Sequence, residues 1–391
     1  MTRPPLLAEA EERTRRLQAA MRARAIPQAL FTDESSIAYL GGFWGYLGVE
    51  FGRPTLLLVP AEGEPAVVTP LMESRMVEAM TWIADVRPWE DSGPRGWAAV
   101  LADLLGPETG EVLWVERGAL PALVRGWFDE ARPATPLKDV GPILGGQRMI
   151  KSPLEIDVMR QAGRIAGAMM AAAHASLQPG APEYRSALAV IEAGTEAAAG
   201  FLTAEGWERF VSPLIHNLAI LQSGADTAMV HRRASVKPYE VGDPVYFCFC
   251  TMAQFKQYKL GFDRLFHIAR VSREAERAQQ TAIDAQRAAL DAIRPGVAAE
   301  DVAAAADAVY RARGFEAGYR TGRSIGVAYL EAPELKAGDR TALAPGMTFA
   351  VDGGVSLGDD LGGRIGDSIV VTEDGFEFLT DYPREIMVTP A

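Results

Sequence analysis

The sequence predicts two domains, an α/β domain followed by an α+β domain, and three observations support this organisation. The chain has 391 residues, more than one hydrophobic core usually supports. Its first third alternates helix-like stretches with short apolar runs, as α/β domains do. In its second half, a pattern of helix, Pro-Gly and helix occurs twice, and strand candidates follow each copy. We therefore expect domains at residues 1–145 and 146–391.

The first domain begins with a charged segment. Its first 26 residues place charges between apolar residues at helical spacing, which predicts a surface helix. They lack an uninterrupted apolar core with a small-residue cleavage site, so we do not interpret them as a signal peptide. Four short apolar runs predict strands: RPTLLLVP, EPAVVTP, WIADVRPW and EVLWVE.

The domain boundary falls in a segment rich in Gly and Pro, residues 141–153, and a long helical pattern follows it. Ser152 precedes Pro153 and lies three residues before Glu155. That spacing is typical of a capping box with Pro at the first helical position. It predicts the start of the first long helix of the second domain.

The second domain contains an internal repeat. HASLQPGAPEYRSALAVIEAG around Pro179 is similar to ALDAIRPGVAAEDVAAAADAVY around Pro295. The strand candidates VYFCFC and FDRLFHIARV lie between the two copies, and MTFAVDGG and GRIGDSIVVTEDGFEFLT follow the second. Two helix pairs against a curved antiparallel sheet would bury one face and leave the other to line a pocket.

The composition limits the kinds of partner that the protein can bind. The formal net charge is −12 and no cluster of Lys and Arg is present, which argues against nucleic-acid binding. The two cysteines, Cys248 and Cys250, fit a reducing compartment. No apolar run approaches the roughly 20 residues that span a bilayer. We expect a cytoplasmic protein with a small-molecule substrate and no membrane partner.

Several segments resemble the creatinase/aminopeptidase P/prolidase family. RMIKSPLEIDVMRQAGRIA resembles its opening helix, and LAPGMTFAVDGG with GGRIGDSIVVTEDGFEFLT resembles its C-terminal strands. SGADTAMVHRRASVKPYEVGD and YRTGRSIGVAYLEAP resemble its His-containing and Gly-His-x-x-Gly segments. The resemblance covers most of residues 148–391 and implies the pita-bread fold for the second domain.

Peptidases of this family hold two divalent metals, and this chain departs from their pattern. By resemblance, Cys248 stands at the first Asp position and Asp263 at the second. Arg323 replaces the His, Asp352 stands where Glu is usual, and Gly366 replaces the last carboxylate. A cationic Arg repels a metal and Gly offers no donor. We therefore expect no cofactor, with a single softer ion on Cys248 and Asp263 as the minor alternative.

Creatinase within this family resembles the chain in working without metals. The resemblance implies that His231 transfers protons and that Asp263 and Asp352 hold a cationic group of the substrate. It also implies that the segment Phe51 to Arg53 binds the substrate carboxylate across the interface of a homodimer. Arg suits that role because its fork of donors pairs a carboxylate bidentately.

The residues themselves point to His as the general base, since only His titrates near neutral pH. His174 lies in a helical pattern and reads as structural. His267 shares the face of Asp263 on a strand, and His216 lies in a strand candidate that could also line a pocket. Each alone is more often a structural His, but the resemblance favours His231.

Two further side chains have open roles. Arg323 could neutralise Asp263 or Asp352, or hold an anionic group of the substrate. The apolar run VYFCFC favours burial of Cys248 as a small hydrophobe. Its pocket position by resemblance leaves a thiolate nucleophile as the alternative.

These observations predict a metal-independent hydrolase that cleaves a C–N bond in a small, carboxylate-bearing amidino- or amide-type substrate. One alternative is a divergent Xaa-Pro metallopeptidase, which metal analysis would distinguish. The others are a lyase that uses the same base and a catalytically silent binding protein. The effect of replacing His231 would distinguish an enzyme from the silent protein.

Overall fold

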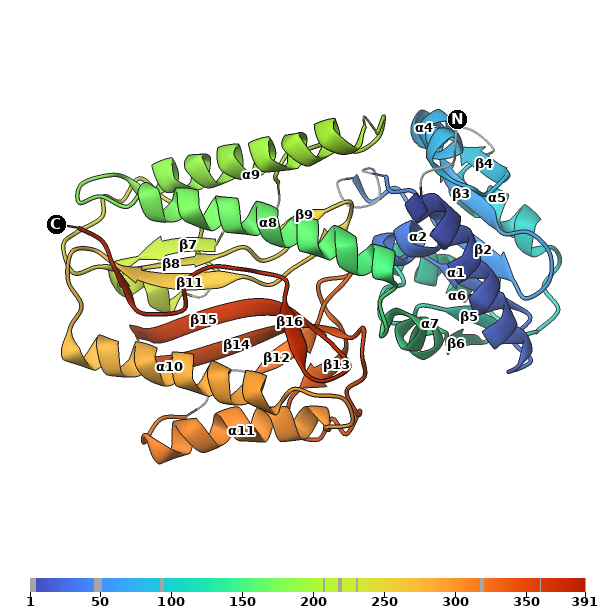
Figure 1. The fold of residues 1–391 in the computed structure, drawn as a ribbon. Helices are drawn as coiled ribbons and strands as arrows, with labels where there is room; N and C mark the ends of the chain where they lie inside the picture. Colours follow the sequence, from blue (N-terminus) through green and yellow to red (C-terminus); the bar gives the residue numbers. More distant parts are fainter. Residues whose placement is uncertain are drawn as a thin grey trace. The chain divides into compact units, whose positions relative to one another are not determined.

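The computed structural model describes residues 5–45, 51–91, 95–206, 208–216, 220–229, 231–316, 320–358 and 360–390 (Figure 1). The chain divides into two compact units, Met1–Gln147 and Arg148–Ala391.

The first unit is an α/β domain, as predicted. Its described strands form one sheet in the order β4-β3-β2-β1-β5-β6. β1 runs antiparallel to β2 and parallel to β5, so the sheet is mixed. Side chains such as Leu30, Leu56 and Val115 are buried together on it. The elements are α1 (Pro5–Arg22), β1 (Gln28–Phe31), α2 (Glu34–Gly41), β2 (Leu56–Pro60), β3 (Ala66–Pro70), α4 (Leu71–Met80), β4 (Asp85–Trp89), α5 (Trp97–Leu105), β5 (Leu113–Val115), α6 (Ala122–Ala131) and β6 (Leu137–Asp139).

Part of the Gly- and Pro-rich boundary segment is helical: α7 spans Gly141–Arg148. Pro142 lies in the first turn, where the missing N–H costs no intrahelical bond. Leu144 is buried and anchors the helix. Composition alone thus overstated the irregularity of this segment, because one buried side chain and a favourable Pro position suffice for a short helix.

The second unit consists of two helix pairs and a large antiparallel sheet, which confirms the predicted pita-bread architecture (Figure 1). The described strands of this sheet follow the order β13-β12-β14-β15-β11-β8-β7, with β16 beside β15 and β17 parallel to β11, while β9 and β10 form a separate two-stranded sheet. The elements are α8 (Pro153–Ala175), α9 (Glu183–Glu205), β7 (Ile220–Ser223), η1 (Gly224–Ala228), β8 (Pro244–Cys248), β9 (Gln254–Phe255), β10 (Tyr258–Lys259), β11 (Asp263–His267), α10 (Arg273–Ala292), α11 (Ala299–Ala312), β12 (Gly322–Ser324), β13 (Glu331–Leu335), β14 (Thr348–Leu357), β15 (Asp360–Val371), β16 (Phe376–Phe378) and β17 (Met387–Val388).

The first helix of this unit starts as predicted. The Ser152 side chain accepts from the Glu155 N–H, and the Glu155 side chain accepts from the Ser152 N–H. This capping box satisfies two N–H groups that would otherwise lack partners. The predicted repeat is also present, as the pairs α8/α9 and α10/α11.

Both helix pairs cover the same face of the sheet. The His174 ring of α8 packs against Phe266 of β11, with centroids 4.8 Å apart. A Cβ placed on Gly353 of β14 would lie 2.1 Å from the Ala282 carbonyl oxygen of α10. Phe266 and Gly353 point away from Asp263 and Asp352, because side chains alternate along a strand. The carboxylates therefore lie on the face opposite the helices.

One described helix, α9, is long and apolar enough by length and composition to cross a membrane. Its buried residues, such as Ser186, Val190 and Gly194, recur at three- to four-residue spacing and form one stripe. A single helix of this kind is weak evidence for a membrane span, since core helices of globular proteins share these properties.

Candidate functional site

Four of the positions singled out in the sequence lie in one row across the sheet. In the register of the strands, Cys248 on β8 pairs with Asp263 on β11. Asp263 pairs with Gly366 on β15, and Gly366 pairs with Asp352 on β14. Directly opposed residues point to the same face. Cys248, Asp263 and Asp352 are all buried, so the row forms a closely packed polar strip.

Arg323 extends the row by one strand. It pairs with Ala350 on β14, two residues from Asp352 and on the same face. Its guanidinium donates to the Asp352 carboxylate, with Nη1 2.8 Å from Oδ2, and also contacts the Tyr329 hydroxyl. Both members of the ion pair are more than nine-tenths buried. Of the roles predicted for Arg323, the structure therefore shows the neutralisation of Asp352.

Gly366 lets the two carboxylates approach. A Cβ at this position would lie 2.2 Å from Asp263 Oδ2 and 2.8 Å from Asp352 Oδ1. Real Cβ atoms essentially never come so close to other atoms, so a side chain at this position would require the two carboxylates to shift. The absence of a side chain at Gly366 thus permits the present spacing of the two acids.

The two acids differ in their surroundings. Burial and the nearby charge of Asp352 raise the pKa of Asp263 well above its usual value, and Asp263 Oδ1 is buried without a hydrogen-bond partner among the described residues. Burial also raises the pKa of Asp352, but the charge of Arg323 opposes this effect. Asp263 is therefore the member of the pair that takes up a proton more readily, while Asp352 is the partner of Arg323.

The two thiols lie beside this row. The sulfur atoms of Cys248 and Cys250 are 3.2 Å apart, and Cys250 Sγ is 3.0 Å from the Tyr329 hydroxyl. The hydrogen bond to Cys250 and burial raise the pKa of Cys248 well above its usual range. Hydrogen bonds from Cys248 and Tyr329 and the charge of Arg323 lower the pKa of Cys250 to about 7.

Sequence reasoning did not assign Cys250 to the site. The signal that was available is that both cysteines of the chain lie two residues apart next to a pocket position. The deciding neighbour, Tyr329, is 79 residues away in the sequence. No local pattern indicates such a contact.

Two family models match the chain. The model described as metallopeptidase family M24 matches residues 157–373, and the creatinase/prolidase N-terminal domain matches residues 13–150. The chain belongs to metallopeptidase family M24. The resemblance inferred from the sequence motifs is thereby confirmed.

Full-length relatives differ in what their names describe. The chain is 32% identical to an agropine synthesis cyclase from Rhizobium rhizogenes, over 93% of this chain and 94% of that one. It is 26% identical to an ectoine hydrolase from Halomonas elongata, over 94% of both chains. The crystal structure of dipeptidase PepE from Mycobacterium ulcerans covers all of both chains with a TM-score of 0.79 and 28% identity. Members of M24 this similar to the chain therefore include hydrolases and a cyclase.

The donor set of this M24 member does not fit a pair of metal ions. Arg323 forms an ion pair with the carboxylate of Asp352, and the side chain of Gly366 offers no ligand atom. In the part of the chain that the structure describes, no three His, Cys, Asp or Glu side chains are grouped so that they could hold a metal ion. A guanidinium inside the row would repel a divalent cation.

His231 lies next to β7, the strand beside Cys248: the Arg232 carbonyl accepts from the Leu221 N–H, and Ile220 pairs with Cys248. His231 is exposed at the turn that follows η1. Among the described residues no hydrogen bond joins it to Asp263 or Asp352. Its neighbour Arg232 is held by Glu183, with 2.6 Å between Nη2 and Oε1, which fixes the chain beside it. The proton-transfer role of His231 stays a prediction.

The predicted carboxylate-binding segment lies in the first unit. Phe51 is 67% exposed. Arg53 forms an ion pair with Asp91, with 2.9 Å between nitrogen and oxygen, and its side chain is one-third exposed. An exposed pair of this kind is weak, so Asp91 could exchange for another carboxylate at little cost. The substrate role of this segment also stays a prediction.

Of the remaining histidines, His216 is exposed and His267 is buried. His216 is exposed and lies outside any strand, because β7 begins only at Ile220; the strand interpretation of its segment is wrong there. His267 is buried on β11, and burial lowers its pKa to about 4, so it is neutral at pH 7. Its Nε2 has no partner in the described structure.

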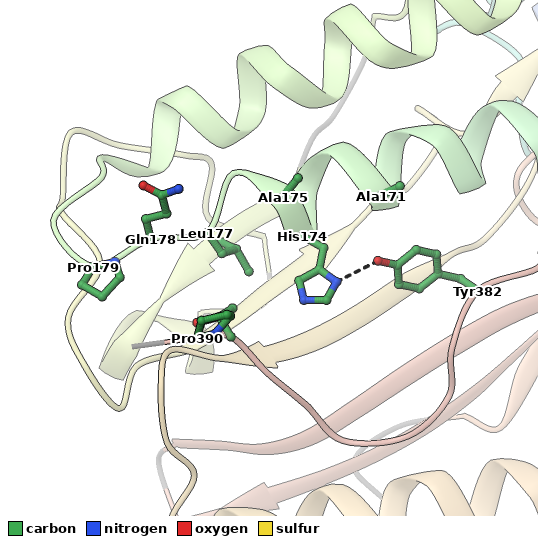
Figure 2. A pocket seen from close by; sticks show the side chains of 9 residues that line it. Ala171, His174, Ala175, Leu177, Gln178, Pro179, Tyr382 and Pro390 are labelled. Carbon is green, nitrogen blue, oxygen red and sulfur yellow. Dashed lines mark hydrogen bonds between the residues drawn. The ribbon is translucent and has the colours of Figure 1, made fainter.

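His174 lines a separate cavity of about 800 Å³ beneath α8 (Figure 2). Its Nδ1 lies 3.0 Å from the Tyr382 hydroxyl, and burial lowers its pKa. The ring also packs on Phe266, which points to the helix-covered face. The cavity is therefore on the opposite side of the sheet from the carboxylates.

Proposed function

We propose that this protein is a metal-independent hydrolase that cleaves a C–N bond in a small, carboxylate-bearing amidino- or amide-type substrate. The observation that carries the proposal is the buried Arg323–Asp352 ion pair beside Asp263, whose pKa is raised, in the row where two-metal members of the family hold their ions. Two relatives, one named an agropine synthesis cyclase and the other an ectoine hydrolase, support chemistry other than peptide cleavage.

Asp263 supplies the acid of the reaction. Breaking a C–N bond requires a proton on the leaving nitrogen, and a carboxylic acid with a raised pKa can deliver it. Asp263 Oδ1 is buried and unpartnered within the described structure, so a substrate nitrogen or oxygen bound there would satisfy it. Asp352 is committed to Arg323 and holds its carboxylate in place.

His231 and Arg53 complete the proposal. His231 transfers a proton between water and substrate, and Arg53 binds the substrate carboxylate in a homodimer, both carried over from the creatinase resemblance. His231→Ala should lower turnover by about two to four orders of magnitude with little change in substrate binding. Arg53→Ala should weaken binding first, because it leaves a substrate anion unpaired.

The test is a substrate screen with N-acyl amino acids, guanidino acids and Xaa-Pro dipeptides, run with chelator and with added Mn²⁺, Zn²⁺ or Co²⁺. We expect turnover of a non-peptide substrate that the chelator does not abolish. Cleavage of Xaa-Pro dipeptides only in the presence of a metal would overturn the proposal in favour of a metallopeptidase. An elimination product would indicate a lyase.

A further inference from the structure

We infer that Cys250 is the nucleophile of this site, and that its sulfur attacks the carbon of the scissile C–N bond to form a thioester or thioimidate intermediate. The inference rests on the proposed C–N hydrolysis and deepens it. It assigns a covalent mechanism and the group that carries it.

The surroundings of Cys250 suit a thiolate. Its sulfur lies 3.2 Å from Cys248 Sγ and 3.0 Å from the Tyr329 hydroxyl, and both of these groups can donate a hydrogen bond to it. Arg323 contacts the same Tyr329 hydroxyl, and its guanidinium lies 4.4 Å from the centre of the Tyr329 ring. Two groups thus contact the Cys250 sulfur, and a fixed cation lies behind Tyr329, an arrangement that favours a thiolate.

The structure also decides between the two thiols. Cys248 is 7% exposed and points its sulfur at Cys250, whereas Cys250 is only partly buried. A hydrogen bond to Cys250 raises the pKa of Cys248, and the same contact lowers that of Cys250 to about 7. Cys248 therefore acts as a donor that positions the thiolate. The sequence favours burial of Cys248 and leaves a nucleophilic role as the alternative; the geometry assigns that role to its neighbour Cys250.

The reaction balances with the groups present. The Cys250 thiolate adds to the carbon, the C–N bond breaks, and the leaving nitrogen takes the proton of Asp263. Water then adds to the thioester carbon, one of its protons passes through His231 to the Asp263 carboxylate, and the C–S bond breaks to release the thiolate. Asp263 and Cys250 return to their starting forms, and one water molecule is consumed. Asp263 pairs with Cys248 across the sheet, which places the acid next to the thiol pair.

Alkylation tests the assignment without a known substrate. The chain contains two cysteines, so the modification rate of Cys248 is the internal control for that of Cys250. We expect iodoacetamide at pH 7 to modify Cys250 at least about tenfold faster than Cys248, measured by peptide mass spectrometry. Tyr329→Phe and Cys248→Ala should shift the pH dependence of Cys250 modification upward, because each removes a donor to the thiolate. Equal rates at the two thiols, or faster modification of Cys248, would overturn the assignment.

Turnover separates this inference from the proposed function. With a substrate from the screen, Cys250→Ser and Cys250→Ala should each lower turnover by more than about 100-fold, provided that circular dichroism shows both variants folded. Acid quenching of the wild-type reaction should show a mass increase equal to the acyl group on the peptide with Cys250. Wild-type turnover that survives in both folded variants would refute the nucleophile and leave the hydrolase proposal standing. If the wild type turns over no substrate, the proposed function fails, and the alkylation ratio decides the status of Cys250.

Discussion

The buried ion pair between Arg323 and Asp352 is the residue-scale feature with the largest expected effect on stability. Both side chains are almost fully buried. Removing one partner leaves an uncompensated charge, so Arg323→Met should lower the free energy of unfolding by about 3–5 kcal/mol. Urea unfolding measures this change.

Two variants serve as controls for this prediction. Arg340→Ala removes a cation that is 86% exposed and should change stability by less than about 1 kcal/mol. The double variant Arg323→Met, Asp352→Asn should recover part of the loss, because the second change removes the stranded charge. An Arg323→Met protein as stable as the wild type would contradict the burial of this pair.

The raised pKa of the Asp263 carboxyl makes stability depend on pH. Its pKa is raised above the usual 3.8, so the folded state holds a proton that the unfolded state loses. The stabilisation is full below pH 3.8 and is lost as the pH rises toward the folded pKa. Asp263→Asn mimics the neutral acid and does not titrate. Relative to the wild type, it should therefore gain up to about 1.4 kcal/mol per pH unit above 3.8.

Denaturation of both proteins at several pH values between 5 and 8 measures this trend. A stability difference between wild type and Asp263→Asn that stays constant over the range would show that Asp263 does not hold a proton.

At the scale of elements, α8 contains two glycines whose substitution should have opposite effects. A Cβ on Gly163 would lie 1.7 Å from the Leu379 carbonyl oxygen, whereas on Gly167 it would lie 3.5 Å from the Asp381 carbonyl oxygen. Ala is favoured over Gly in a helix by about 1 kcal/mol. Gly167→Ala should therefore stabilise the protein by up to about 1 kcal/mol. Gly163→Ala should destabilise it by more than about 2 kcal/mol, since backbone must move.

Thermal and urea denaturation of the two variants side by side would show the contrast. Two changes of the same sign would mean that α8 does not pack on the segment around Leu379 as described.

At the scale of the whole molecule, the creatinase resemblance predicts a homodimer. The expected species has twice the 42.1 kDa mass of the chain. Light scattering coupled to size exclusion at micromolar concentration measures this mass. A monomer at that concentration would also remove the basis for a role of Arg53 in the partner's site.

The sequence alone determined the architecture of this protein. Strand runs in the first domain, the capping box at Ser152 and the repeated helix pairs were all predicted from local patterns, and the structure contains them. These features depend on side-chain periods of 2.0 and 3.6 residues and on capping chemistry, which act within a few residues. Family motifs then aligned Cys248, Asp263 and Asp352 as candidates for one site.

Only the tertiary structure decided how that site works. The partner of Arg323, the need for Gly at position 366 and the contact between Cys250 and Tyr329 all arise where separate strands and loops meet. Residues 29 and 79 positions apart come together there, and their charges shift one another's pKa in a buried setting. A sequence read locally does not specify those distances, so the raised pKa of Asp263 and the contacts of Cys250 emerged only from the folded sheet.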